Sequence, residues 1–106
     1  MGKKEHVIKD LKIFAKNISA DIEITKMVFF GSMATGKANR DSDIDLIIVS
    51  PNFRKKPFWQ RSIGLHRHWT LDIPVDFLCL TPEEFDRKKR GITIVRDAVR
   101  EGIEIA

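Results

Sequence analysis

The stretch FFGSMATGKANRDSDIDLIIVS, residues 29–50, decides the fold. An apolar run ends at Gly31 and Ser32, a polar segment follows, and Asp43 and Asp45 then open a second apolar run. An apolar run that stops at a glycine indicates a strand followed by a turn. The stretch therefore predicts two strands joined by a turn, with two carboxylates at the start of the second strand.

The same residues approach a P-loop, the phosphate-binding motif of many NTP hydrolases and kinases. Gly31, four further residues, Gly36 and Lys37 fit that motif, but the next residue is Ala38. The motif needs a Ser or Thr hydroxyl at this position to bind Mg²⁺. The lysine should also open a sizeable helix, whereas here it is followed by a turn cluster and then by a strand that begins at Asp43. We therefore reject the P-loop interpretation.

Asp43 and Asp45 are two residues apart, so on a strand both side chains point to one face, with about 6.6–7 Å between their Cα atoms. Two such carboxylates repel each other unless a proton or a cation lies between them. Carboxylate oxygens suit Mg²⁺ or Mn²⁺, which keep several waters and accept phosphate oxygens as further ligands. The pair therefore predicts a divalent metal site. The alternative is two carboxylates that merely end a polar turn.

A third carboxylate, Asp76, interrupts the apolar run VDFLCL at residues 75–80. A carboxylate within an apolar strand is costly unless it is paired or binds a metal. If this strand neighbours the strand of Asp43, then Asp76 completes a triad at one end of the sheet. Asp72, which lies before Pro74 at the entrance to the strand, is the rival candidate.

Periodicity and turn residues predict the remaining elements. Apolar residues at helical spacing indicate a first helix that ends near Ala20, and the capping box that starts at Thr81 indicates a later one. The expected helices cover 7–20, 33–37 (capped by Ser32), the part of 53–70 that begins at Pro57 (weakened by Gly64) and 81–102 (interrupted at Gly91), and the expected strands cover 25–30, 43–49, 75–80 and 103–106. This order predicts an α+β fold, as a single domain over residues 1–106. Its small mixed sheet should have helices packed mainly on one face.

The composition indicates a globular protein without disulfides. The 106 residues carry a formal net charge of +4, and 42% of them are hydrophobic. Cys79 is the only cysteine, and no segment resembles a signal peptide or the run of about 20 apolar residues that crosses a membrane. We therefore expect a cytoplasmic protein with no membrane partner. The basic balance favours anionic partners such as nucleotides or RNA.

Positive charge is concentrated between Pro51 and Leu71, a segment without acidic residues. Its basic side chains are Arg54, Lys55, Lys56, Arg61 and Arg67. The segment Arg54–Arg67 therefore predicts nucleic acid as a partner, with bases stacking on Trp59 or Trp69. The alternative is a solvated helix face whose tryptophans belong to the core.

These motifs carry a family resemblance. Gly31-Ser32, then Asp43-Ile44-Asp45, and a later Asp76 in an apolar strand resemble the nucleotidyltransferase superfamily of the DNA polymerase beta type. The phrase FGS…G…SDIDLIIVS is similar to its minimal members, the MNT proteins. The resemblance covers most of the chain. It implies a polymerase beta palm-like fold and transfer of NMP, in particular AMP from ATP, to a hydroxyl acceptor.

The resemblance also implies a role for each matching residue. Gly31 and Ser32 would bind the triphosphate of an NTP. The catalytic residues would be Asp43, Asp45 and Asp76, which would bind two divalent ions, Mg²⁺ or Mn²⁺. Asp76 would also help to deprotonate the acceptor hydroxyl.

The sequence departs from the family next to the glycine-serine turn. Many minimal members carry arginines there, whereas this chain has Met33 and Thr35. Lys37 and Arg40 are the residues expected to contact the nucleotide phosphates instead.

The chain is too short to hold the extra domains that position an acceptor in larger relatives, so we expect another chain to help. The resemblance implies a HEPN-type toxin as that protein partner, with this chain as the antitoxin that nucleotidylates it. Two alternatives belong to other classes. One is a non-catalytic module that neutralises a protein partner by contact, and the other is a nucleic-acid-binding domain with vestigial aspartates.

Overall fold

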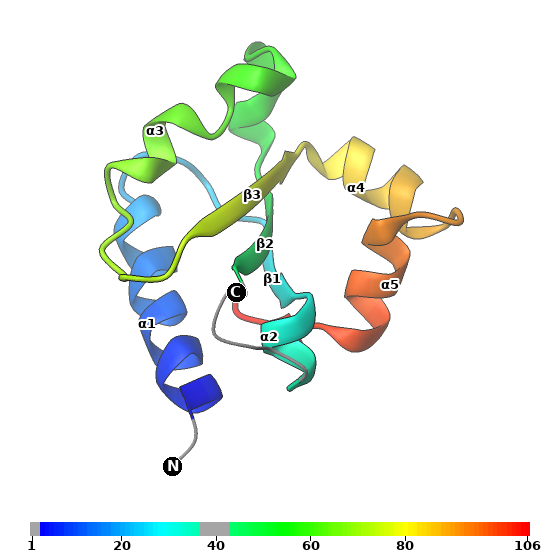
Figure 1. The fold of residues 1–106 in the computed structure, drawn as a ribbon. Helices are drawn as coiled ribbons and strands as arrows, with labels where there is room; N and C mark the ends of the chain where they lie inside the picture. The colour runs from blue at the N-terminus through cyan, green and yellow to red at the C-terminus, as the bar shows by residue number, and fades with distance from the viewer. Residues whose placement is uncertain (1–2, 37–42) are drawn as a thin grey trace.

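The computed structural model describes residues 3–36 and 43–106, which contain one mixed β-sheet with the strand order β3-β2-β1-β4 (Figure 1). Strands β1 and β2 are antiparallel, β4 pairs antiparallel with β1, and β3 runs parallel to β2. The bounds are β1 (Lys26–Phe30), β2 (Ile44–Val49), β3 (Val75–Leu80) and β4 (Ile103–Glu104). The expected mixed sheet is confirmed, including the short strand near the C-terminus.

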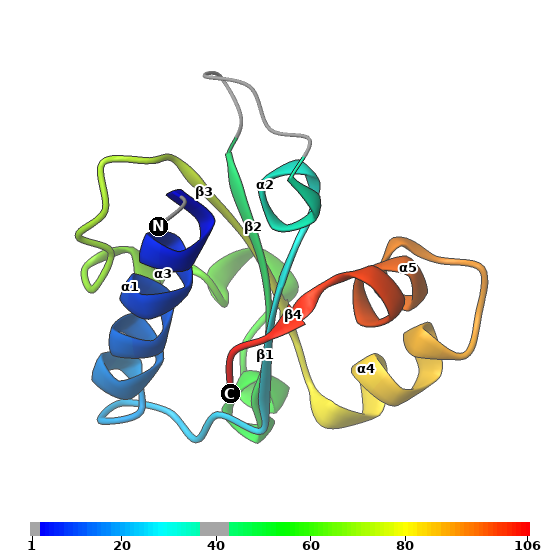
Figure 2. The same ribbon diagram turned by 90° about the horizontal axis from the view of Figure 1, so that it is seen from below.

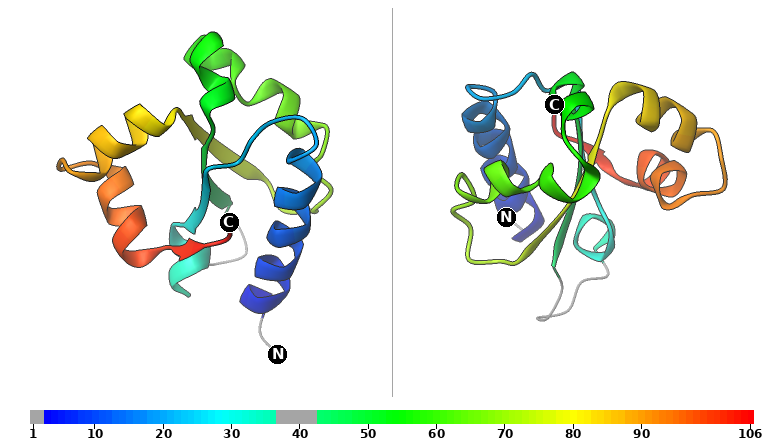
Figure 3. Two further views of the ribbon diagram at one scale, coloured as in Figure 1. Left: turned by 180° about the vertical axis from the view of Figure 1, so that it is seen from behind. Right: turned by 90° about the horizontal axis from the view of Figure 1, so that it is seen from above.

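Helices cover both faces of this sheet. Figure 2 shows α1 and α3 on one side and α4 and α5 on the other, and the views in Figure 3 agree. The bounds are α1 (Lys3–Ile18), α2 (Ser32–Thr35), α3 (Ile63–His66), α4 (Pro82–Lys89) and α5 (Ile94–Glu101), with 3-10 turns η1 (Pro51–Lys55) and η2 (Phe58–Gln60). Of the helices described, none is long and apolar enough to cross a membrane.

The α+β class is confirmed, but the placement of the helices corrects the expectation of one covered face. In β2, Leu46 and Ile48 pack in the core under α1, whereas Ile47 and Val49 pack in a second core with α4 and α5. All four side chains are at most 1% exposed. A strand that is apolar on both faces must be covered on both faces. The sequence of β2 already carried this signal.

The helix expected to begin at Pro57 does not form as one helix, because the segment between β2 and β3 contains the short elements η1, η2 and α3. Pro57 disfavours the helical conformation at the preceding residue, which separates η1 from η2. Lys56 accordingly has extended backbone angles, with φ −120° and ψ 136°. Trp69 packs edge-on against Phe14 with ring centroids 5.1 Å apart, whereas Trp59 is 70% exposed. The expectation that the tryptophans belong to the core therefore holds for Trp69 only.

Arg61 ties this segment to the sheet and to α4. Its side chain is only 8% exposed, and one guanidinium nitrogen donates to Glu84 at 2.6 Å and to the carbonyl of Cys79 at 3.1 Å. Glu84 also completes the predicted capping box by accepting from the backbone N–H of Thr81. The start of α4 is therefore fixed relative to the end of β3. The predicted interruption at Gly91 is also confirmed, because α4 and α5 are separate helices.

Candidate active site

Asp45 and Asp76 lie opposite each other on neighbouring strands. Strands β2 and β3 are parallel, and their register pairs Asp45 with Asp76. Because paired residues on adjacent strands project from the same face, the two carboxylates meet on the side covered by α4 and α5. Asp43 lies one residue before β2 and is exposed. The structure therefore brings the predicted carboxylates to one end of the sheet.

Gly31 passes directly over the carboxylate of Asp45. The glycine is the N-cap residue of α2, with φ 85° and ψ −168°, so the prediction that Ser32 caps this helix is wrong. A Cβ atom at Gly31 would lie 2.2 Å from Oδ2 of Asp45. This backbone conformation is essentially restricted to glycine. Only glycine therefore allows the turn and the carboxylate to lie so close together.

The turn, the two strands and α5 enclose a cavity of about 710 Å³. Gly31 and Ser32 form one wall, and Asp45 and Asp76 lie beside them. Helix α5 also lines the cavity and contributes further acidic and apolar side chains. The cavity is large enough for part of a nucleotide, because small-molecule sites occupy about 300–1,000 Å³.

The three aspartates differ in burial, and they repel one another. Burial, followed by repulsion from Asp76 and Asp43, raises the pKa of Asp45 above its ordinary value of 3.8. Asp45 is half-buried, whereas Asp76 is exposed. The cost of burying a carboxylate therefore falls on Asp45 and not on Asp76, where the sequence argument placed it.

The donor atoms fit a hard divalent cation. Within residues 3–36 and 43–106, no three His, Cys, Asp or Glu side chains form a group that could hold a metal ion by themselves. Mg²⁺ does not need such a group, because it is usually bound by one or two carboxylates, water and substrate phosphates. Asp45 and Asp76 supply such a pair of carboxylates. Asp43 repels the Asp45 carboxylate as well, and a bound cation would relieve this repulsion.

The sequence matches a family described as "Nucleotidyltransferase domain" over residues 11–100. The chain belongs to this family. Its fold is similar to that of a "putative nucleotidyltransferase" from Sulfolobus solfataricus, with a TM-score of 0.68 and 21% identity over 98% of this chain and 87% of that chain. Another solved "putative nucleotidyltransferase" is 29% identical, covers 78% of this chain and 87% of its own, and has a TM-score of 0.48. No curated protein matches the sequence.

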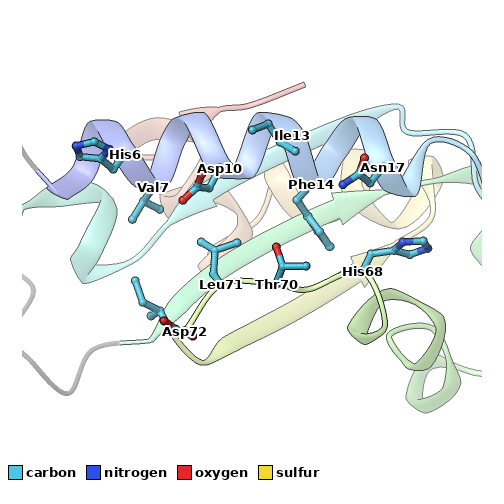
Figure 4. Close-up of a pocket in the computed structure, with 11 residues that line it drawn as sticks. His6, Val7, Asp10, Ile13, Phe14, Asn17, His68, Thr70, Leu71 and Asp72 are labelled. Carbon is cyan, nitrogen blue, oxygen red and sulfur yellow. The ribbon is translucent and has the colours of Figure 1, made fainter.

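Membership of the nucleotidyltransferase domain family confirms the resemblance drawn from the glycine-serine turn and the aspartates. The geometry also distinguishes between Asp76 and Asp72, the two candidates for the third carboxylate of the site. Asp76 lines the cavity with Asp45, whereas Asp72 lines a different cleft between α1 and the segment 68–73 (Figure 4). Lys37 and Arg40, the predicted phosphate contacts, lie outside the described residues.

Sequence reasoning missed the contribution of α5 to the cavity that holds Asp45 and Asp76. Asp97 and Glu101 line the same cavity as Asp45 and Asp76. Their spacing of four residues places them on one helix face, but the sequence does not say what that face contacts. The contact depends on α5 packing against β1 and on the chain then returning as β4.

Proposed function

We propose that this nucleotidyltransferase domain transfers a nucleoside monophosphate from an NTP to a hydroxyl acceptor, with Mg²⁺ or Mn²⁺ bound. The observation that carries the proposal is the pairing of Asp45 with Asp76, directly beside the turn at Gly31. Membership of the family supplies the general class of reaction. We further propose ATP as the donor, AMP as the transferred group and the cytoplasm as the location, in line with the resemblance to MNT proteins.

Each residue of the site has its own part in the proposed reaction. Asp45 and Asp76, with Asp43 beside them, would hold the divalent ions. Such ions, when bound, stabilise the attacking and the leaving oxygens of an in-line displacement. Gly31 leaves the space in which the Asp45 carboxylate lies, and Ser32 would donate its hydroxyl to a phosphate oxygen from the cavity wall.

The proposed step needs only the NTP and the acceptor. The acceptor hydroxyl oxygen forms a bond to the α-phosphorus, and the bond between that phosphorus and the bridging oxygen of pyrophosphate breaks. Pyrophosphate leaves with the negative charge. The hydroxyl proton passes to Asp76, whose side chain is exposed at the edge of the sheet and within reach of an incoming acceptor.

We propose a protein as the acceptor, in preference to an isolated small molecule. The cavity is open, and nothing in the described part of the chain forms a second domain over it. A partner chain would therefore complete the acceptor side. In line with the resemblance, we propose a HEPN-type toxin as this partner and an antitoxin role for the present chain.

Nucleic-acid binding through the basic segment has less support. Each of its three arginines forms an ion pair. The pairs are Arg54 with Glu83, Arg61 with Glu84, and Arg67 with Asp21. An arginine that already neutralises a carboxylate has less charge to offer a phosphate. The exposed Trp59 and its basic neighbours Lys55 and Lys56 remain, so nucleic acid stays a prediction that is separate from the catalytic proposal.

Two labels on ATP test the proposed reaction. The protein and its co-purified or genomically adjacent partner are incubated with Mg²⁺ and ATP labelled at the α- or the γ-phosphate. We expect the partner to acquire label only from the α-position, because pyrophosphate carries the γ-phosphate away. Transfer of γ-label would indicate a kinase and refute the proposal. Absence of transfer from either position, with Mg²⁺ and with Mn²⁺, would also count against it.

A further inference from the structure

We propose that Asp97 and Glu101 are specificity-determining residues that select an acceptor hydroxyl carried on a basic segment of a protein. This inference rests on the proposed function, because it concerns the acceptor side of the same cavity. It goes beyond that function by naming the residues of α5 that recognise the acceptor and by specifying that they recognise its positive charge.

Helix α5 supplies one part of the wall of the cavity that Asp45 and Asp76 also line. Asp97 and Glu101 line the cavity from one face of the helix, one turn apart. Both side chains are exposed to the solvent that fills the cavity, and 65% of the Asp97 side chain is accessible. Ile94, one turn earlier, lines the same wall and is 62% exposed. This wall therefore presents acidic and apolar groups side by side.

The described lining of the cavity is acidic. Asp45, Asp76, Asp97 and Glu101 all line it, and no Lys, Arg or His side chain does so among the residues that the structure describes. Asp97 has one distant ion pair, 3.9 Å from the guanidinium of Arg96. Glu101 takes part in none of the ion pairs found between described residues.

The nucleotide and its metal ions would not neutralise this wall. An NTP carries about four negative charges, and two divalent ions balance these charges. The carboxylates of α5 are then left to act on the acceptor. The end of a nucleic acid would bring further phosphates and be repelled, whereas a lysine or arginine beside the hydroxyl would be attracted.

The apolar part of the wall favours a protein segment over a cationic sugar. Ile94 and Ala98 from α5 face the cavity together with Phe30 and Leu78 from the sheet. These side chains can contact the hydrocarbon stems of lysine and arginine, or an aromatic ring that bears the hydroxyl. The hydroxyl-rich faces of a sugar would gain nothing from such a surface.

Peptide binding measures the proposed selectivity directly. Three fluorescent peptides share one tyrosine and differ only in the flanking residues, which are lysine, glutamine or glutamate. Their affinities are measured by anisotropy at low salt, with Mg²⁺ and an ATP analogue that cannot be cleaved between the α- and β-phosphates. We expect the lysine peptide to bind about tenfold more tightly than the glutamate peptide, because exposed charge pairs contribute modestly and additively.

Charge-neutral variants identify the residues responsible. The double variant Asp97→Asn, Glu101→Gln should reduce the preference to about twofold, because it removes the charge and keeps the shape. Asp86→Asn on α4 is the matched control, since Asp86 is exposed and outside the cavity, and its preference should equal that of the wild type. Equal binding of the three peptides, no binding of the lysine peptide at millimolar concentration, or a preference that survives the double variant would overturn the inference.

The two proposals fail in different ways. Loss of α-label transfer to the natural partner would contradict the proposed reaction itself. Intact transfer to the natural partner, together with peptide binding that does not depend on peptide charge, would contradict only the role of α5. A single-stranded oligonucleotide with a free 3′-hydroxyl completes the binding panel, and binding of it as tightly as the lysine peptide would also overturn the inference.

Discussion

Replacing Gly31 by alanine tests whether the turn must lie against Asp45. The added Cβ would sit 2.2 Å from Oδ2 of Asp45, whereas carbon and oxygen atoms normally stay about 3.3 Å or more apart. The carboxylate or the turn must therefore move by about 1 Å, the difference between these two distances. The backbone adds its own cost, because φ 85° with ψ −168° is a glycine-only conformation worth about 1–3 kcal/mol.

The expected effect on activity exceeds the effect on stability. A displacement of about 1 Å in a catalytic group can lower the rate about 100-fold, while a backbone penalty of about 2 kcal/mol leaves most small domains folded. We therefore expect Gly31→Ala to remain folded in circular dichroism and to lose about 100-fold in α-label transfer. Binding of Mn²⁺ in the presence of a non-cleavable ATP analogue should weaken in parallel.

Gly36→Ala is the matched control in the same turn-helix unit. Gly36 also has a positive φ, 82°, but a Cβ atom there would meet no atom within 4 Å. The left-handed backbone should cost about 1 kcal/mol, and activity should stay within about threefold of the wild type. If Gly31→Ala and Gly36→Ala transfer label equally well, then the contact between the turn and Asp45 has no role in the reaction and the reasoning is refuted.

Three further predictions concern the fold and the metal site. Arg61→Ala should lower the free energy of unfolding in urea by about 3 kcal/mol, because it leaves Glu84 without its buried partner, whereas Arg54→Ala breaks an exposed pair and should change it little. Although burial favours the protonated form of Glu84, bonds from Arg61 and from the backbone of Thr81 outweigh it and hold its pKa below the ordinary 4.5. The stabilisation from Glu84 should therefore be present above pH 4.5 and disappear as the pH falls through the lowered pKa, and Glu84→Gln should lack this part of the acid transition in a pH series of melts. Asp45→Asn should weaken Mn²⁺ binding at least tenfold by electron paramagnetic resonance with melting unchanged or improved, since it removes a half-buried charge; unchanged Mn²⁺ binding would contradict the metal assignment.

Local sequence signals predicted the strands and the spacing of their carboxylates. The alternation of apolar residues placed Ile44, Leu46 and Ile48 on one face, so Asp45, which directly precedes Leu46, could only lie on the other. The interruption of VDFLCL likewise predicted that Asp76 shares a face with Leu78, and both line the cavity. These inferences succeeded because the period of a strand is two residues, whatever the rest of the fold does.

Features that depend on long-range packing could not be predicted in the same way. The repeat of apolar residues from Phe58 to Trp69 suggested one helix starting at Pro57, but the structure has two short elements, η2 and α3, on either side of Arg61, which bonds to Glu84 on α4. The glycine-serine turn was predicted, yet the contact of Gly31 with Asp45 follows from the register of β1 and β2. The spacing of Asp97 and Glu101 indicates an acidic face on α5, but no local signal shows which cavity that face lines, because this depends on the packing of α5 against β1.

The most direct test of the central claim compares two aspartates that flank the same turn into β3. Asp76→Asn and Asp72→Asn are assayed for Mg²⁺-dependent transfer of α-label from ATP to the partner protein, with folding checked by thermal melts. Asp76 lines the cavity with Asp45, and Asp72 lines the cleft beside α1. The account predicts loss of transfer in Asp76→Asn and wild-type transfer in Asp72→Asn. Full transfer by a folded Asp76→Asn protein would contradict it.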